Sequence, residues 1–161
     1  RSNKVRVAIA AWPWAAYLGG EGVQRGVRLQ TSSYQRIHVN SLMTKAKTVG
    51  NYVNSILASL EAKRAGCDEA LMLDSQGYVA ECSGENVFVC KGGRVKTSPA
   101  TAILPGITRD TILRLLADAG VPAEERPFTR DETYLADEVF MTGTAAEVTP
   151  VREIDGRVIG K

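Results

Sequence analysis

The sequence predicts an α+β domain, in which short strands joined by tight turns accompany two amphipathic helices. Three observations lead to this prediction. Short apolar runs are separated by turn sequences such as DSQG and KGGR, which is typical of antiparallel strands. Two longer segments have apolar residues at the i, i+3, i+4, i+7 spacing of a helix. The strands and helices alternate irregularly, which favours an α+β domain over a doubly wound parallel sheet.

The first part of the chain contains two predicted strands. Residues 5–12, VRVAIAAW, are rich in β-branched residues and meet Pro13, and residues 27–33 are a second strand candidate. Gly19 and Gly20 lie between the two strands. We expect the intervening segment to link two domains.

A helix is predicted from Asn51 onward, and Gly66 can end it. Its helical spacing comes from four apolar residues, Val53, Ile56, Leu57 and Leu60. This spacing predicts an amphipathic helix, whose apolar face normally packs against a core.

The segments after this helix predict an antiparallel meander of short strands, formed by EALMLD, YVAEC, NVFVC and VKTS. A second helix opens at LPGITRD and closes at Gly120. Residues 138–151 are again strand-like but are broken at Gly143, and DGR near the end of the chain is a predicted hairpin turn.

Composition and charge narrow the class of protein. The 161 residues carry a net charge of +2 from 20 basic and 18 acidic side chains that are interspersed along the chain, so nucleic acid is not an expected partner. No apolar run approaches the ~20 residues of a membrane span, and the first residues lack the small-residue cleavage site of a signal peptide. We therefore expect a cytoplasmic protein that does not bind membranes.

The cysteines and the histidine exclude several kinds of site. Cys67, Cys82 and Cys90 are odd in number and form no C-x-x-C pair, which argues against a disulfide framework and a zinc site. His38 is the only histidine, so a histidine-dependent nucleophile would have to be paired with it. We expect no metal centre.

Two charged residues are candidates for chemistry. Lys47 has small or apolar neighbours, and burial there would lower the pKa of its amine, as a nucleophilic lysine requires. The alternative is an ordinary surface lysine whose stem lies along apolar atoms. Glu81 lies within an apolar strand, where a buried carboxylate needs a cationic or donor partner, unless the strand is an edge strand and Glu81 faces water.

Two backbone segments are candidates for ligand binding. The free amides of Ile107 and Thr108 at a helix start, with the Thr108 hydroxyl, can receive a phosphate, although Thr108 can equally be a simple N-cap. The small residues GTAA at 143–146 can let backbone amides approach a ligand, or can form an ordinary bulge. A reactive lysine, a carboxylate and a phosphate cup are together what pyridoxal phosphate requires.

Four motifs carry a resemblance to a known family. They are KTVGNY at 47–52, ECSGEN at 81–86, LPGITR at 104–109 and YLADEVFMTGTAAEVTPV at 134–151. In this order they resemble the branched-chain amino acid aminotransferases, which are pyridoxal-phosphate enzymes of fold type IV. AAWPWAAYLG at 10–19 resembles the interdomain segment of that family. The resemblance implies a pseudo-barrel of mostly antiparallel strands with helices.

The resemblance also implies roles for individual residues. Lys47, and not Lys45, matches the lysine that binds the cofactor covalently and moves a proton between the substrate carbon and the cofactor. Tyr52 matches the partner of the cofactor's phenolic oxygen, and Glu81 matches the acid on its pyridine nitrogen. The phosphate contacts of the family match Ile107, Thr108 and Thr144. The donor to the substrate carboxylate matches the Ala145 amide, and the aromatic residues of the substrate side-chain pocket match Trp14 and Tyr17.

The implied reaction moves an amino group from leucine, isoleucine or valine to 2-oxoglutarate. D-amino acid aminotransferases and aminodeoxychorismate lyases resemble the lysine and LPGITR regions too, but usually have a serine-rich segment in place of G-E-N and lack GTAAE. Cys82 stands where the family commonly has glycine.

Family members are close to twice as long as this chain. Residues 1–19 therefore match a remnant of a small N-terminal domain and its linker, and residues 20–161 match the large cofactor-binding domain without its final segment. The arginine that grips the phosphate would come from the absent part, so a non-catalytic fragment is the alternative. The family implies a homodimer at least, and hexamers occur.

Overall fold

The structure is a computed structural model that describes residues 3–13 and 24–160. Its helices and strands are β1 (Val27–Thr31), η1 (Val49–Asn51), α2 (Tyr52–Arg64), β2 (Glu69–Leu73), β3 (Val79–Cys82), β4 (Asn86–Lys91), β5 (Arg94–Thr97), α3 (Ile107–Asp118), β6 (Ala123–Glu125), α4 (Arg130–Tyr134), β7 (Glu138–Gly143), β8 (Glu147–Ile154) and β9 (Arg157–Val158).

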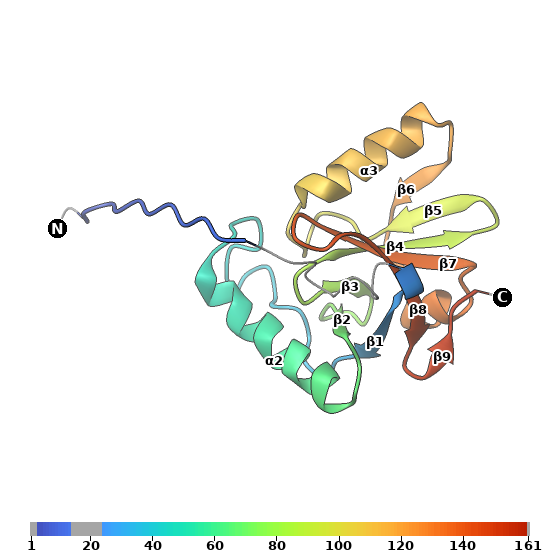
Figure 1. Ribbon diagram of the computed structural model, residues 1–161, viewed down its shortest axis with the longest axis horizontal. Coiled ribbons are helices and arrows are strands. Elements are labelled where there is room, and N and C mark those ends of the chain that lie inside the picture. The colour runs from blue at the N-terminus through green and yellow to red at the C-terminus, as the bar shows by residue number, and fades with distance from the viewer. Residues whose placement is uncertain (1–2, 14–23, 161) are drawn as a thin grey trace.

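The described strands form one curled sheet, in the order β3-β2-β1-β8-β7-β4-β5-β6, with β9 paired to β8 (Figure 1). Most neighbours are antiparallel, whereas β1 runs parallel to both β2 and β8, and β6 runs parallel to β5. The curvature brings β3 into contact with β4, although these two strands are far apart in the strand order. The predicted α+β class and its mostly antiparallel half-barrel are confirmed.

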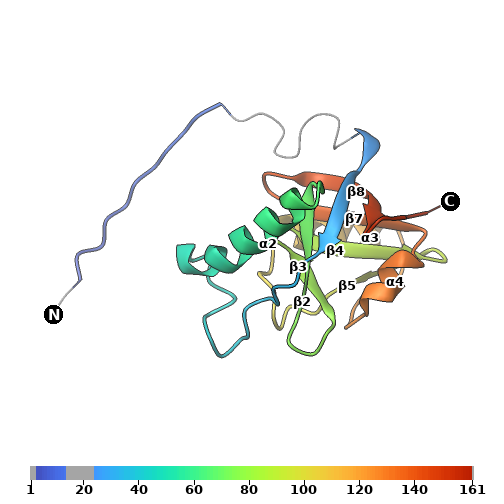
Figure 2. The ribbon, with the colours of Figure 1, turned by 90° about the horizontal axis from the view of Figure 1, so that it is seen from below.

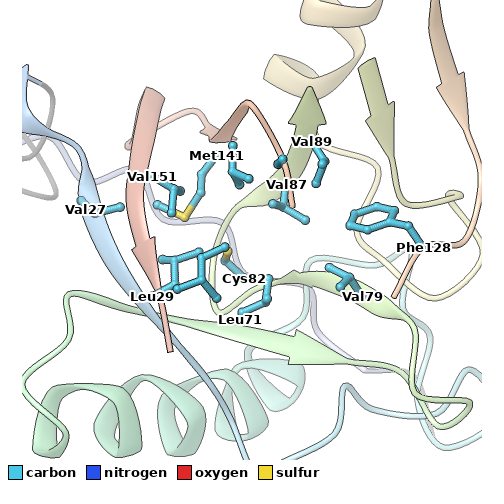
Figure 3. Packing of buried hydrophobic residues seen from close by; sticks show 13 residues of the cluster. Val27, Leu29, Leu71, Val79, Cys82, Val87, Val89, Phe128, Met141 and Val151 are labelled. Atoms are coloured by element: carbon cyan, nitrogen blue, oxygen red, sulfur yellow. The ribbon is translucent and has the colours of Figure 1, made fainter. Parts of the chain in front are cut away.

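The inside of the curled sheet holds the main apolar core. Side chains from β1, β2, β3, β4, β7 and β8 meet there, together with Phe128 from the segment after β6 (Figure 3). The fully buried members include Leu29, Leu71, Val87 and Met141. Glu81 of β3 and Asn86 of β4 are also buried but do not belong to this apolar cluster.

The predicted meander is wrong in its connectivity. β2 pairs with β3 and β4 pairs with β5, but β1, β8 and β7 separate the two hairpins in the sheet. After β3 the chain makes a tight turn, in which the Cys82 amide donates to the Glu85 carbonyl, and β4 then pairs with β7 along five residue pairs. Sequence adjacency predicted one continuous meander because both hairpins carry the same local signals.

Residues 5–12 do not form the predicted strand. They are extended but pair with no strand, and Val5, Val7 and Ile9 are 89%, 85% and 95% exposed. Figure 1 shows this segment running away from the sheet. A strand needs a neighbouring strand to satisfy its backbone groups, and none of the described strands pairs with residues 5–12.

The predicted helix after Asn51 is confirmed as α2, but the face predicted to be buried is wrong. Ala58 and Ala62 are buried against Ala70 and Met72 of β2, so small side chains bring α2 close to the sheet (Figure 2). The four large apolar residues of the predicted face are instead between 41% and 60% exposed, and they are Val53, Ile56, Leu57 and Leu60. The spacing identified the helix but not the side that packs.

The two remaining sequence predictions for local structure are confirmed. The strand broken at Gly143 is the hairpin of β7 and β8, whose register pairs Gly143 with Glu147. DGR is the turn between β8 and β9, where Asp155 and Gly156 adopt φ angles of 51° and 74°. Among the described residues, no helix is long and apolar enough to cross a membrane.

We predict that Ala58→Leu lowers the free energy of unfolding by about 1–3 kcal/mol, because the added methylenes do not fit between α2 and β2. Urea denaturation measures this change. The control is Leu115→Ala on α3, which trims a side chain that is more than half exposed and should change stability by less than about 0.5 kcal/mol. An Ala58→Leu variant as stable as the parent would contradict the packing described here.

Candidate active site

Glu81 of β3 is a buried carboxylate held by three partners from separate segments. Arg36 Nε donates to its Oε1 at 2.5 Å, Asn86 Nδ2 donates to its Oε2 at 3.2 Å, and the Leu104 amide donates to its Oε2 at 3.2 Å. The residue is only 5% exposed. The prediction of a cationic and donor partnership is therefore confirmed, and the alternative in which Glu81 faces water is wrong.

Burial dominates the electrostatics of this carboxyl group. Desolvation raises the pKa of Glu81 to about 7, although the charge and hydrogen bond of Arg36 and the Leu104 amide act in the opposite direction. Glu81 is therefore partly protonated near neutral pH, and its partners offset part of the cost of burying the charged form.

Asn86 connects Glu81 to the start of helix α3. Its Nδ2 also donates to the Leu104 carbonyl at 3.0 Å, and its Oδ1 occupies the space that a Cβ on Gly106 would need. Only glycine fits at position 106 without moving Asn86. This close approach places the beginning of α3 beside the carboxylate.

The start of α3 presents free backbone donors. Gly106 is the N-cap, and Ile107 and Thr108 are the first two helical residues. The amides of a first helical turn have no acceptor within the helix, so they can bind an anion. The alternative in which Thr108 is a simple N-cap is wrong, because Gly106 has that position and no side chain caps the helix.

The two lysines of the segment before α2 have different surroundings. Lys45 Nζ donates to the carbonyl oxygens of Thr101 and Ile103 at 3.1 and 3.4 Å, and burial lowers the pKa of Lys45. Lys47 is exposed, which favours the surface alternative for its side chain, and it lines the same cavities as Glu81. Lys45 is therefore held by two carbonyls, whereas Lys47 borders the candidate site.

One cavity of about 240 Å³ brings together most of the predicted residues. Those that line it are Lys47, Glu81, Ile107, Thr108 and Thr144. A smaller cavity shares Lys47 and Glu81 with it and is also lined by Tyr52 and Arg36. Residues from four distant parts of the chain thus converge on one space.

Three of the predicted residues are not placed in this space. Ala145 is exposed beside Thr144, in the turn between β7 and β8, and does not line either cavity. Trp14 and Tyr17 lie outside the described residues. Their predicted roles in substrate binding rest on the family resemblance alone.

Buried polar atoms around the cavities fit a ligand rich in acceptors and donors. Thr142 Oγ1, which belongs to a residue of the larger cavity, is buried without a hydrogen-bond partner. Arg36 Nη1 and Asn51 Oδ1, from residues of the smaller cavity, are buried and equally unpaired. Since unpaired buried polar groups are costly, these atoms suit a bound molecule with an anionic group and a polar ring.

Sequence reasoning missed three charged or polar residues of the site, which are Arg36, Glu85 and Asn86. Glu85 is buried, and its side chain packs against Gly143, where a Cβ would lie 3.3 Å from Glu85 Cγ. Desolvation and the nearby Glu69 raise the pKa of Glu85 to about 8. Glu85 and Asn86 lie in a motif noted in the sequence, whereas nothing local to Arg36 signalled its contact with Glu81.

Comparison with known proteins decides the family. Residues 1–154 match the family described as amino-transferase class IV. The chain belongs to the class IV aminotransferases. The resemblance to the branched-chain enzymes within this family, which the four motifs predicted, is confirmed by individual relatives.

Several class IV aminotransferases are closely similar in sequence and fold. The branched-chain-amino-acid aminotransferase of Pseudomonas aeruginosa is 59% identical over 98% of this chain and 51% of that protein, and the Escherichia coli K12 protein is 48% identical over 96% and 50%. The crystal structure of the E. coli enzyme matches with a TM-score of 0.92 at 47% identity, covering 94% of this chain and 50% of that one. The chain spans about half the length of these relatives.

A further solved structure carries a ligand related to the expected cofactor. The T.th. branched-chain amino acid aminotransferase with pyridoxamine 5′-phosphate matches with a TM-score of 0.88 at 55% identity, covering 93% of this chain and 49% of that one. No group of three or more His, Cys, Asp or Glu side chains suited to a metal ion occurs within residues 3–13 and 24–160.

We predict that the free energy of unfolding falls as pH rises from about 5 to about 8. The folded protein keeps protons on Glu81 and Glu85 up to pH of about 7 and 8, whereas an unfolded chain releases them near their ordinary pKa of 4.5. Between these limits the folded state binds more protons, so each rise in pH favours unfolding. Urea denaturation across this pH range should show that the free energy of unfolding declines less in Glu85→Gln than in the parent protein. If the free energy of unfolding of the parent did not change with pH, the raised pKa values of Glu81 and Glu85 would be refuted.

Proposed function

We propose that this chain provides the cofactor-binding part of a branched-chain amino acid aminotransferase. The enzyme uses pyridoxal phosphate to move the amino group of leucine, isoleucine or valine to 2-oxoglutarate. The observation that carries the proposal is the cavity that joins Lys47, Glu81 and the free amides at the start of α3. The names of the relatives above and the pyridoxamine phosphate in one of them support it.

The residues of the two cavities fit pyridoxal phosphate at both of its ends. When bound, this cofactor supplies a ring that withdraws electrons from the reacting carbon. The amides of Ile107 and Thr108 and the Thr144 hydroxyl would hold its phosphate, and Glu81 would accept a hydrogen bond from its ring nitrogen. Tyr52 would donate to its phenolic oxygen. The positive end of the α3 dipole would favour the anionic phosphate.

Lys47 is the residue that acts on the substrate. Its amine would hold the cofactor covalently, and as a free amine it would take a proton from the substrate carbon and return it. The Ala145 amide holds the substrate carboxylate, and Trp14 and Tyr17 line the side-chain pocket. These last roles follow the family resemblance.

The domain organisation and the assembly belong to the same proposal. Residues 20–161 are the large cofactor-binding domain, and residues 1–19 belong to the small domain and its linker. The exposed apolar side chains of α2, among them Ile56 and Leu57, support a homodimer or hexamer in which this face is covered. The free cysteines among the described residues are consistent with the cytoplasm.

We predict that Lys47→Ala abolishes covalent attachment of pyridoxal phosphate, because Lys47 lines the cavity and Lys45 is held by two backbone carbonyls. Borohydride reduction followed by peptide mapping locates the attached cofactor. Lys45→Ala is the matched control and should keep the visible absorbance of the attached cofactor. A reduced adduct on Lys45 would refute the assignment of Lys47.

We predict that an extended chain of the relatives' length converts L-leucine, L-isoleucine and L-valine with 2-oxoglutarate and leaves D-alanine unchanged. The 161-residue chain alone should bind the cofactor weakly and react slowly, because positioning of reactants supplies ~7–11 kcal/mol of a barrier and this chain spans about half the length of its relatives. Steady-state assays of both lengths test this. Preferred turnover of D-alanine would assign the chain to a different fold type IV enzyme.

A further inference from the structure

Arg36 is a buried charged residue without a role in the proposed reaction. It lies in the segment after β1, where its backbone amide donates to the Leu73 carbonyl of β2 at 2.8 Å. The residue is 7% exposed. The hydrogen bond to β2 fixes the backbone at Arg36, and this fixes the position from which its side chain enters the protein interior.

The guanidinium of Arg36 is paired at one nitrogen and unpaired at another. Its Nε donates to Glu81 Oε1 at 2.5 Å, while its Nη1 is buried without a partner. Arg36 also lines the smaller cavity together with Lys47 and Tyr52. Because a guanidinium does not lose its proton in proteins, this is a fixed positive charge directly behind the carboxylate.

We propose that Arg36 is a positioning residue whose permanent charge favours the ionised form of Glu81, so that Glu81 accepts a hydrogen bond from the ring nitrogen of a bound cofactor instead of donating one. This inference deepens the proposed function and rests on it for the identity of the ligand. It assigns Arg36 an electrostatic task, carried out through Glu81, without contact between Arg36 and the reacting atoms.

Among the groups around Glu81, Arg36 contributes most to stabilising the ionised carboxylate. Burial raises the pKa of Glu81, the charge of Arg36 is the largest influence that lowers it, and the charge of Lys45 contributes less. Lys47 lines the same cavities as Glu81.

Two acidic groups also lie close to Glu81. Burial is the main cause that raises the pKa values of Cys82 and Glu85, and the charges of Glu69 and Glu81 add to it, which favours the protonated form of both groups. Neutral neighbours do not repel the carboxylate. Burial therefore favours the protonated form of Glu81, whereas Arg36 favours the ionised form, together with the hydrogen bonds from the Asn86 side chain and the Leu104 amide.

Ionisation of Glu81 matters because a carboxylate and a carboxylic acid do opposite things at a ring nitrogen. A carboxylate stabilises the protonated, electron-withdrawing ring, whereas a protonated acid donates its own proton in a hydrogen bond and leaves the ring nitrogen uncharged. If Arg36 were replaced by a neutral residue, burial would remain while its main opposing influence was lost. Glu81 would then be protonated at neutral pH.

The test follows Glu81 in the protein without cofactor. Infrared spectroscopy of protein with isotope-labelled glutamate, taken as a difference against Glu81→Gln, reports the pH at which this carboxyl group takes up its proton. In Arg36→Gln the midpoint should rise by about one to three pH units, the usual effect of one adjacent opposite charge. Arg36→Lys should reverse part of this rise, because it restores the charge without the planar fork.

The matched control is Arg114→Gln, which removes an exposed arginine paired with Asp110 on α3 and should leave the midpoint unchanged. Circular dichroism establishes which variants fold, and Arg36→Met replaces Arg36→Gln if the latter does not. An unchanged Glu81 midpoint in the folded neutral variant would overturn the proposal. A purely structural ion pair would lower the melting temperature without moving this midpoint.

A second readout connects the charge to the reaction. In the extended enzyme, Arg36→Gln should lower kcat by about tenfold for each pH unit by which the Glu81 midpoint rises, and it should leave the KM for leucine nearly unchanged. Arg36→Lys should restore part of kcat. A parent-like kcat in Arg36→Gln would overturn the inference. A protein that fails to bind pyridoxal phosphate would contradict the proposed function. The effect of Arg36 on Glu81 could still be measured in that case, because the infrared titration needs no cofactor.

Discussion

The burial of the Glu81 carboxylate is the constraint on which the candidate site depends. A charged carboxylate in a core is tolerated only with partners, and Glu81 has them in Arg36, Asn86 and the Leu104 amide. These three come from the segment after β1, the start of β4 and the loop before α3. Satisfying one carboxylate therefore aligns three segments that are far apart in sequence.

The alignment also places the anion-binding end of the site. Asn86 leaves no space for a side chain on Gly106, so the first turn of α3 lies directly beside the Glu81 network. The two ends of a ring-and-phosphate ligand are thus set by one continuous set of contacts. Glu85 and Glu69 are buried nearby with raised pKa values, which leaves Glu81 as the carboxyl group with a guanidinium partner in this cluster.

Local signals predicted much of the fold but did not predict how its elements pair. Turn sequences and helical spacing located both hairpins and α2 correctly. They failed where the outcome depends on distant partners: β4 pairs with β7 instead of β3, and residues 5–12 have no neighbouring strand in the described chain. The spacing of α2 also selected Leu57 for the core, although Ala58 packs there, because close approach to β2 requires small side chains.

The site could be predicted from sequence where a residue type is unusual for its surroundings. Glu81 was found because a carboxylate in an apolar strand needs an explanation, and its family motif supplied one. Arg36 could not be found in this way, since its importance arises only when the curled sheet brings it to Glu81. The sequence left open whether Lys47 is buried or lies on the surface, and the structure shows it exposed, because neighbouring residues in sequence do not decide what covers a side chain.

The most direct test of this account is nitrogen-15 NMR of pyridoxal phosphate labelled at the ring nitrogen and bound to the protein. The account predicts a protonated ring nitrogen in the parent protein, hydrogen-bonded to an ionised Glu81, and loss of that proton in Glu81→Gln while the cofactor remains bound. An unprotonated nitrogen in the parent, or a protonated one that is unaffected by Glu81→Gln, would contradict the central place given to this carboxylate.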